Sequence, residues 1–414
     1  MHLNETDPMA LAMSRQNITR FALPDKPAVQ SELLALRYDL TSRFYKGACL
    51  DRAPEINTYQ DLLVKFGDLS SVANPLETIR NVYRSELHRV LDLTRSGHNP
   101  ALVSEQISNV RQATLATAFR LAVQETSGDL ALAIGGSAVN GVHSFLTDID
   151  FVVLPHSPED REAARNVQNK MIGLLESLGI ESDGNLPSLF GYRTLPELKK
   201  KYGALTGPET RAEAAVDFAF QSSYPFFLFL MDLRILDVSD AKGTGLKSIF
   251  NKGLEDLRDS LAFSFPDHIE FVARESYKDT ELRGPSLKDL RAIDLKKSAL
   301  RLFHFSLYAA RARYGIKASD FWHIIKELEA KGAMQEQEAA AAEKALRFMI
   351  RLRHLAGYAL TDTFDSAILS DQTLNRLSHV MAKSREELNA DISAARDTLL
   401  SLARTLLVTS PAAK

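Results

Sequence analysis

The spacing of apolar residues predicts helices over most of the first third of the chain. Residues 1 to about 30 are polar and are interrupted by three prolines, so we expect a loosely ordered N-terminus. After them, apolar residues recur at three- and four-residue intervals on one helical face, at Leu33, Leu36, Leu40 and Phe44. The same spacing returns in residues 75–97 and again in residues 100–128, where the Arg and Glu side chains are interpreted as a solvated face.

The pattern changes between Ala131 and Pro155, where two short apolar runs flank a glycine-rich turn. This stretch predicts a strand, a turn at Gly135–Ser137, a loop and a second strand. A helix is expected next over residues 157–179, with Ser157 as its cap. Residues 180–203 are then expected to form a loop-rich insert followed by a short basic helix.

Two later segments also have strand character. Residues 214–220 alternate around Asp217, although their alanine-rich start also permits a helix. Residues 226–240 contain Asp232 and end in a turn at Ser239–Gly245. These segments complete a mixed sheet in the prediction.

The chain is predicted to be helical again from about residue 246, apart from one extended piece. We expect helices over residues 287–314, 318–331, 335–360 and 373–407. The prediction is therefore an α+β fold, with a mixed-sheet core flanked by N-terminal helices and a C-terminal helical bundle. Its four parts are residues 1–30, 31–127, 128–245 and 246–414.

Composition narrows the range of partners. The chain has 414 residues, a net charge of −3 and 25% charged residues, which argues against nucleic acid as a partner. No apolar run reaches about 18 residues, so we expect no membrane span. The single cysteine, Cys49, excludes an internal disulfide and a cysteine-cluster metal site. We expect a soluble cytoplasmic protein, and its helical flanks leave room for a homodimer.

Asp148 and Asp150 are the strongest candidates for chemistry. Side chains alternate along a strand, so both carboxylates should share one face while Ile149 and Phe151 occupy the other. Two adjacent carboxylates repel each other unless a cation lies between them, and Mg²⁺ usually arrives with substrate phosphates. The glycine turn is not a Walker loop, because no Gly-Lys-Ser/Thr follows the glycines.

A glycine-serine turn followed by an Asp-x-Asp strand resembles the nucleotidyltransferase superfamily. Within it, the chain resembles the PII uridylyltransferase-like proteins, and most of all their relatives that are often fused to CBS domains, the signal-transduction nucleotidyltransferases. Their pattern, Gly-Ser-x-x-Arg-x-Glu and then Thr-Asp-x-Asp, aligns without a gap on residues 136–150. Later segments follow the family order at Tyr192–Arg193, Asp232–Arg234, Asp294–Arg301 and Arg351–His354, so the resemblance covers roughly residues 85–405.

The resemblance implies a metal-dependent transfer of a nucleoside monophosphate from an NTP, such as ATP or UTP, to a hydroxyl group, with a protein as the acceptor. Two Mg²⁺ ions would be held by Asp148, Asp150 and a third carboxylate, for which Asp232 is the first choice and Asp217 the second. A salt bridge is the structural alternative for Asp232. Nucleotide contacts would come from a larger set, Gly135, Gly136, Ser137, Asn140, Thr147, Lys296 and Arg301, although a solvated helix face also explains the last two.

Two positions depart from the family pattern. Asn140 stands where the family has Arg, and Val142 stands where it has Glu. An Arg at position 140 would make forked, charge-assisted contacts to phosphate. The departure leaves open a catalytically weak, nucleotide-sensing or protein-binding scaffold. A third alternative, which the small size of the chain permits, is a toxin or effector that modifies a host protein or a tRNA.

For several other polar residues we expect a structural role rather than a catalytic one. His143 is interpreted as a surface histidine rather than a base, although it lies in the loop before the aspartates. Arg351, Arg353 and His354 are expected to pack or to pair between helices.

Overall fold

The computed structural model describes a large part of the chain, in residues 27–46, 55–69, 72–145, 147–180, 191–203, 232–240, 243, 245–262, 292–295, 300–358 and 368–408. Several predictions fall elsewhere. Asp217, Lys296 and Cys49 lie outside the described residues, as do the N-terminal 26 residues and most of the insert after residue 180.

A small antiparallel sheet lies at the centre of the described fold. Its strands are β1 (Leu130–Ile134), β2 (Phe151–Pro155) and β3 (Arg234–Ser239), in the order β2-β1-β3. Ile134 at the end of β1 is opposite Phe151 in β2 and Arg234 in β3, so the residues just beyond this row meet at one end of the sheet. The described strands pair only antiparallel, whereas the sequence had suggested a mixed sheet.

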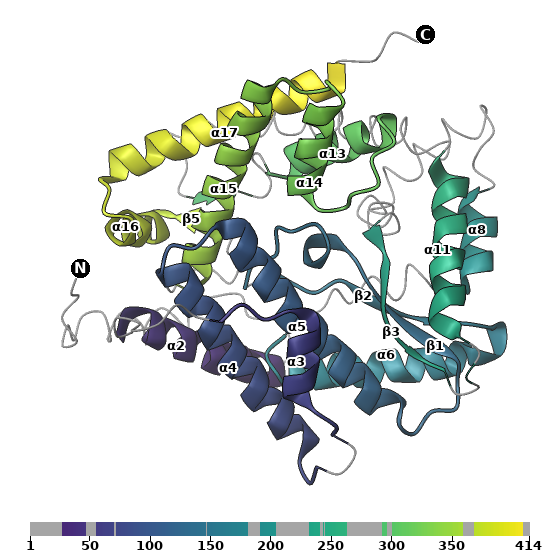
Figure 1. The fold of residues 1–414 in the computed structure, drawn as a ribbon. Coiled ribbons are helices and arrows are strands. Elements are labelled where there is room, and N and C mark those ends of the chain that lie inside the picture. The colour runs from purple at the N-terminus through teal and green to yellow at the C-terminus, as the bar shows by residue number, and fades with distance from the viewer. Residues whose placement is uncertain are drawn as a thin grey trace, which may run out of the picture.

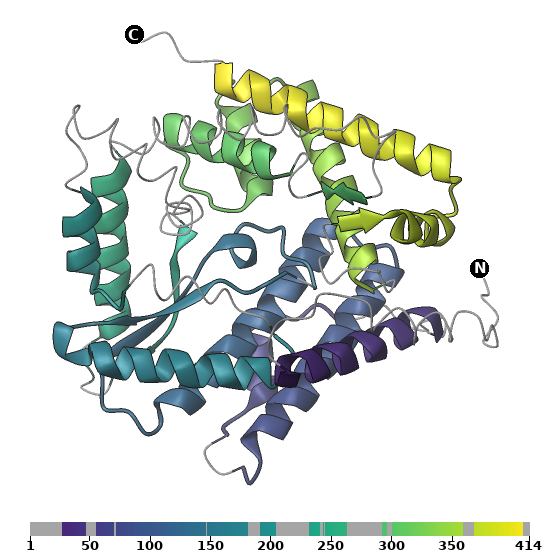
Figure 2. The same cartoon turned by 180° about the vertical axis from the view of Figure 1, so that it is seen from behind.

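The N-terminal helices cover one face of this sheet, as Figure 1 shows. They include α4 (Pro75–Arg95) and α5 (Pro100–Val123). Helix α6 (Arg161–Glu176), which follows β2 in the chain, packs on the same side. Ile134 and Phe151 belong to the buried cluster that these helices form. Two further helices complete this side, α3 (Tyr59–Phe66) and α2 (Pro27–Lys46), and α2 lies beside α6 in the view from behind (Figure 2).

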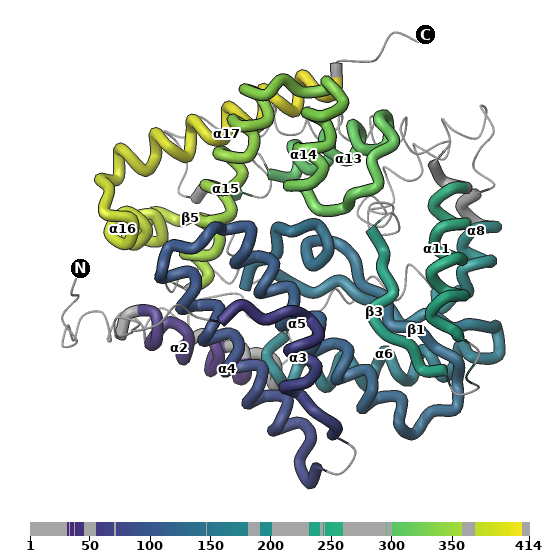
Figure 3. Tube along the Cα trace, viewed as in Figure 1, coloured from purple at the N-terminus to yellow at the C-terminus, as the bar shows by residue number. Residues whose placement is uncertain are grey.

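The opposite face packs into the C-terminal core. Ala133, Val152 and Ile235 are buried in one cluster with residues of two helices that flank the sheet, α8 (Leu195–Gly203) and α11 (Leu246–Ala262). The same cluster continues into the C-terminal helices α13 (Arg301–Arg313), α14 (Phe321–Ala330), α15 (Glu336–Tyr358), α16 (Asp371–Val380) and α17 (Arg385–Val408). Helix α15 also packs against α5, and this contact connects the N-terminal helices to the C-terminal helices. The course of the chain through both sets of helices is drawn in Figure 3.

Most predicted helices are present, and the α+β class is confirmed. Two C-terminal predictions were wrong in detail. Residues 292–294, expected in a helix, form β4 (Ala292–Asp294), which pairs with β5 (Ile368–Ser370). The long helix expected over residues 373–407 is divided into α16 and α17, and Ala382 between them has a φ of +53°, which a right-handed helix cannot accommodate. No helix within the described residues is long and apolar enough to span a membrane.

The central strand should be sensitive to loss of side-chain volume. Leu132 is fully buried in the middle of β1, so Leu132→Ala should lower the free energy of unfolding by about 2–5 kcal/mol. Val64 in α3 is 80% exposed, and Val64→Ala should change stability by no more than about 0.5 kcal/mol. Urea unfolding of both variants tests this, and equal effects would contradict the assigned core.

Candidate functional site

The glycine-serine turn and the Asp-x-Asp segment are in direct contact. The chain leaves β1 through a short 3₁₀ turn, Gly136–Ala138, and the N–H of Gly135 donates to the carbonyl oxygen of Asp150 at 3.1 Å. Gly136 has a φ of +61°, and a Cβ atom added there would lie 2.1 Å from Oδ2 of Asp150. Only glycine permits both this backbone angle and this approach. The Asp150 carboxylate therefore lies directly against the turn.

The two aspartates share one side of their segment. Ile149 is fully buried in the same cluster as Phe151 and Ile134, against the N-terminal helices. Asp148 and Asp150 are only partly buried, and alternation directs them away from that cluster. The predicted arrangement, with both carboxylates opposite Ile149 and Phe151, is consistent with this burial pattern.

This pair of carboxylates suits a cation that takes its remaining ligands from elsewhere. The described residues contain no group of three or more His, Cys, Asp or Glu side chains able to enclose a metal ion. Mg²⁺ is commonly held by one or two carboxylates together with waters and substrate phosphates. Asp148 and Asp150 fit that incomplete donor set, and the neighbouring turn offers backbone N–H groups to an anion.

Asp232 reaches the same end of the sheet but is engaged in a buried ion pair. It precedes β3 and is 1% exposed. Its Oδ1 accepts from Nη1 of Arg311 at 2.8 Å, and its Oδ2 accepts from the hydroxyl of Tyr308, both in α13. Burial raises the pKa of the Asp232 carboxyl, and the adjacent Arg311 guanidinium opposes that rise. The salt-bridge interpretation therefore describes Asp232 in this conformation.

Asn140, at the position of the family Arg, faces the protein interior. It is 7% exposed, and its Nδ2 lies 3.4 Å from the Tyr308 hydroxyl. Its carbonyl accepts from the N–H of Phe321 at 3.1 Å, and the carbonyl of Gly141 accepts from the Trp322 indole at 3.0 Å. Asn140 thus joins the loop to α13 and α14.

Arg111 in α5 organises the loop between the turn and the aspartates. It is 3% exposed, so the prediction that the charged residues of this helix form a solvated face was wrong at this position. Its guanidinium donates to the carbonyl oxygens of Phe145 and Thr147 and, at 3.0 Å, to Nε2 of His143. A signal was available in the sequence, because Arg111 lies one helical turn from both Ile107 and Leu115 on an apolar stripe.

His143 is fully buried, so its interpretation as a surface histidine was wrong. Its Nδ1 lies 2.7 Å from Oγ of Ser137 in the turn. Burial, together with the charge of Arg111, holds the pKa of His143 well below the ordinary histidine value. The ring is therefore neutral at pH 7 and links Arg111 to the glycine-serine turn.

Helix α15 supplies a second set of contacts to the loop. Arg353 donates to Oγ1 of Thr147 at 3.1 Å. Nε2 of His354 lies 3.2 Å from the carbonyl oxygen of His143 and 3.1 Å from Oγ of Ser104 in α5. The predicted packing or pairing between helices is confirmed for His354, which contacts Ser104 of α5, whereas Arg353 is buried against the loop and Arg351 is exposed.

The remaining family-derived positions lie less clearly at this site. Arg301 begins α13 and is partly exposed. Tyr192 lies under the Arg165 guanidinium of α6, whose Cζ is 5.4 Å from the ring centroid.

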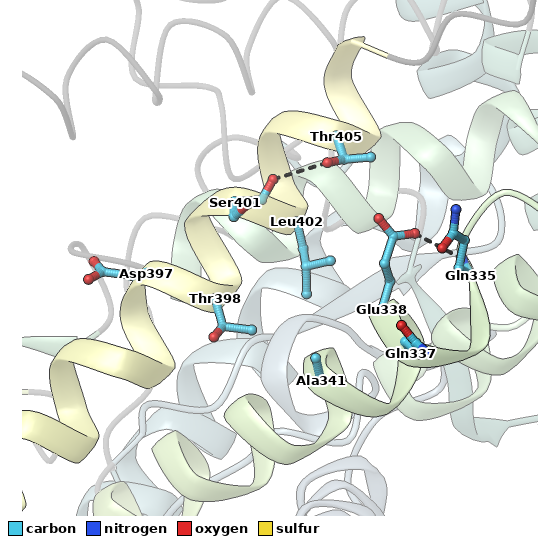
Figure 4. A pocket seen from close by; sticks show the side chains of 9 residues that line it. All are labelled: Gln335, Gln337, Glu338, Ala341, Asp397, Thr398, Ser401, Leu402 and Thr405. Atoms are coloured by element: carbon cyan, nitrogen blue, oxygen red, sulfur yellow. Dashed lines mark hydrogen bonds between the residues drawn. The ribbon is translucent and has the colours of Figure 1, made fainter.

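A groove of about 470 Å³ lies elsewhere, between the start of α15 and the second half of α17 (Figure 4). It is lined by Gln335, Gln337, Glu338, Ala341, Asp397, Thr398, Ser401, Leu402 and Thr405. None of the residues singled out in the sequence contributes to it, so we do not assign the candidate chemistry to this groove.

Comparison with known proteins finds a similarity in the C-terminal part of the chain, which contributes side chains to the candidate site. A family described as "Putative nucleotidyltransferase substrate binding domain" matches residues 282–386. The match relates this region to nucleotidyltransferases. Tyr308, Arg311, Arg353 and His354 all lie within it, so the matched region supplies the side chains that contact Asp232 and the loop. A search of curated proteins found no match to the chain.

The contact between Gly136 and Asp150 can be tested with a matched glycine. Gly315 has the same φ of +61°, but a Cβ there would meet no atom within 4 Å. Gly315→Ala should therefore cost only the backbone strain, about 1–2 kcal/mol in the free energy of unfolding. Gly136→Ala should cost clearly more, because the methyl group must also displace the Asp150 carboxylate. Equal losses in urea unfolding would show that the close approach does not exist.

Burial of His354 predicts a pH-dependent stability. Burial is the main cause that lowers its pKa to about 4, compared with 6.5 for a free histidine. The unfolded chain therefore takes up a proton first, so stability is complete above pH 6.5 and falls as the pH drops from 6.5 towards 4. The loss at this residue should approach about 3 kcal/mol. His354→Gln keeps a donor at the ε position without titrating and should show a smaller loss over this range, which thermal melts at several pH values would measure.

Proposed function

We propose that this protein is a metal-dependent nucleotidyltransferase, which moves a nucleoside monophosphate from an NTP to a hydroxyl group. The observation that carries the proposal is the contact between Gly136 and the Asp150 carboxylate. The Asp150 carboxylate lies against a turn whose backbone N–H groups could bind phosphate, and Asp148 on the same side of the segment could share a cation with it. The family match over residues 282–386 supports the same reaction class.

The turn would bind the phosphates of the nucleotide. The N–H groups of Gly136 and Ser137 and the Ser137 hydroxyl are the donors, in a segment whose conformation is fixed by the Gly135–Asp150 hydrogen bond. Asp148 and Asp150 would hold the cation, two Mg²⁺ ions by analogy with the resembled family. When bound there, Mg²⁺ would neutralise phosphate charge and acidify the acceptor hydroxyl.

Other residues would keep this geometry fixed. Thr147, next to Asp148, is held by Arg111 through its carbonyl and by Arg353 through its hydroxyl, so its side chain is already engaged by protein groups. Asn140 ties the loop to α13 in the same manner. We assign both residues a positioning role rather than direct nucleotide contact.

The acceptor is proposed to be a Ser, Thr or Tyr hydroxyl of a protein. This choice follows the resemblance to PII uridylyltransferase-like and CBS-associated signal-transduction proteins, in which ATP or UTP would be the donor. A net charge of −3 over 414 residues does not favour electrostatic attraction to tRNA, the alternative acceptor.

The contacts of Asp232 favour a second candidate function. This function is a nucleotide-sensing module with weak or no catalysis. Both carboxylate oxygens of Asp232 are occupied by Arg311 and Tyr308, so it is not free to serve as a third metal ligand in this conformation. Asn140 also favours the sensing module, because an amide side chain brings no positive charge to the phosphates. In this case Asp148 and Asp150 would bind a metal–nucleotide complex without completing the transfer.

Calorimetry with Mg²⁺ and each of ATP, UTP, CTP and GTP tests the shared part of both candidates. Wild type should bind one triphosphate only when Mg²⁺ is present, and Asp148→Ala/Asp150→Ala should reduce that affinity by tenfold or more, since both carboxylates are lost. Asp256→Ala removes an exposed carboxylate of α11 and should bind as wild type does. A folded wild type that binds no triphosphate would exclude both candidates.

The bound nucleotide then separates transfer from sensing. Incubation of the wild type with the α-³²P-labelled triphosphate, Mg²⁺ and a cell extract should label a protein and release pyrophosphate. The double variant should do neither. Binding without label transfer or pyrophosphate release would favour the sensing module.

A further inference from the structure

A buried chain of polar groups runs from α5 to the glycine-serine turn. Arg111 Nη1 lies 3.0 Å from Nε2 of His143, and Nδ1 of the same ring lies 2.7 Å from Oγ of Ser137. Arg111 is 3% exposed and His143 is fully buried, while Ser137 is partly exposed in the turn. The chain thus leads from the protein interior to the surface where the phosphates are proposed to bind.

The chemistry of each group fixes the direction of these hydrogen bonds. A guanidinium has no acceptor atom, so it must donate to Nε2, and Nε2 must carry a lone pair. The neutral ring then carries its only proton on Nδ1. This proton faces Oγ of Ser137, which becomes the acceptor of that bond. The low pKa of His143 agrees with a ring that stays singly protonated.

The surroundings hold the His143 ring in this orientation. The carbonyl oxygen of His143 has no proton, so it accepts from Nε2–H of His354 at 3.2 Å. Arg111 also donates to the carbonyl oxygens of Phe145 and Thr147, which fixes the backbone on the other side of the ring. His143 and His354 are therefore expected to adopt opposite tautomers.

We propose that Arg111 and His143 are positioning residues that direct the Ser137 hydroxyl proton towards a phosphate of the nucleotide. Because Oγ already accepts from Nδ1–H of His143, its own O–H is left to donate outwards. A hydroxyl that donates to an anionic oxygen forms a charge-assisted hydrogen bond, which is stronger than a neutral one. This inference rests on the proposed function, since it assumes that phosphate binds at the turn.

The tautomers can be measured without any nucleotide. In ¹⁵N-histidine-labelled protein at pH 7.5, His143 should show a protonated Nδ1 and an unprotonated Nε2, and His354 the reverse. His143→Asn and His354→Gln assign the two signals by their disappearance. A His143 ring protonated at Nε2, or at both nitrogens, would overturn the proposal whatever the protein binds.

Two substitutions of His143 form a matched pair for binding. Asn places its amide nitrogen next to Cγ, as Nδ1 is, so His143→Asn can still donate to Ser137. Gln places its amide at the ε position, so His143→Gln loses that bond. Each variant should first be shown to fold by its far-ultraviolet circular dichroism and melting curve.

In calorimetry with the Mg²⁺–triphosphate that wild type binds, His143→Asn should stay within about threefold of wild type. Ser137→Ala and His143→Gln should each weaken binding about tenfold or more, the cost of one hydrogen bond to a charged group. The Ser137→Ala/His143→Gln double variant should be no weaker than Ser137→Ala alone, since both changes remove one interaction. Losses that multiply, or a His143→Gln variant that binds like wild type, would overturn the proposal.

Failure of the proposed function has a different outcome. If the folded wild type binds no triphosphate, the nucleotide site and the phosphate-directed role of Ser137 fall together. The histidine tautomers would still report whether Arg111 orients His143 towards the turn. Normal triphosphate binding with the opposite His143 tautomer would instead reject only the positioning role.

Discussion

The candidate site depends on a buried guanidinium whose described partners are carbonyl oxygens and a ring nitrogen. Arg111 donates to the carbonyl groups of Phe145 and Thr147, and the second of these is part of the peptide unit that leads into Asp148. Withdrawing a guanidinium from water is costly, and only several well-placed acceptors offset that cost. The loop must therefore keep its shape for the two Nη groups of Arg111 to remain hydrogen-bonded. The same shape presents the two aspartates beside the glycine-serine turn.

Two halves of the molecule meet at this loop. Helix α5 holds it from the N-terminal side through Arg111, and α15 holds it from the C-terminal side through Arg353 and His354. The C-terminal contacts fall inside residues 282–386, the region similar to a nucleotidyltransferase substrate-binding domain. The loop geometry thus depends on both halves, and a shift of either half would move Asp148 and Asp150.

Asp232 shows how this coupling could limit chemistry. Its pair with Arg311 is nearly inaccessible to solvent, with the Asp232 side chain 1% exposed and the Arg311 side chain 11% exposed. Removing one partner from a buried pair commonly costs about 3–5 kcal/mol, because the other charge is left uncompensated. Recruiting Asp232 to a metal would therefore require new partners for Arg311 and Tyr308. A two-carboxylate site needs no such change.

The sequence by itself determined the local elements and the placement of the two candidate aspartates. Apolar periodicity located α4, α5, α6, α14 and α15, and alternation around Ile149 placed Asp148 and Asp150 together on one side. The glycines also predicted the turn at Gly135–Ser137, where the structure has a 3₁₀ turn over Gly136–Ala138. These features depend on neighbours within a few residues, and such short-range constraints can be read from spacing alone.

Only the tertiary structure decided what each polar side chain meets. Spacing assigns Arg111 to a face of a helix, but it does not say that the loop of His143 covers that face. The partner of Asp232 likewise comes from a helix about 80 residues later in the sequence, as the 79-residue separation from Arg311 shows. Burial and pairing at long range depend on how separate elements pack, and that information lies in no single stretch of sequence. For this reason the aspartates were predictable, whereas the side chains that position them were not.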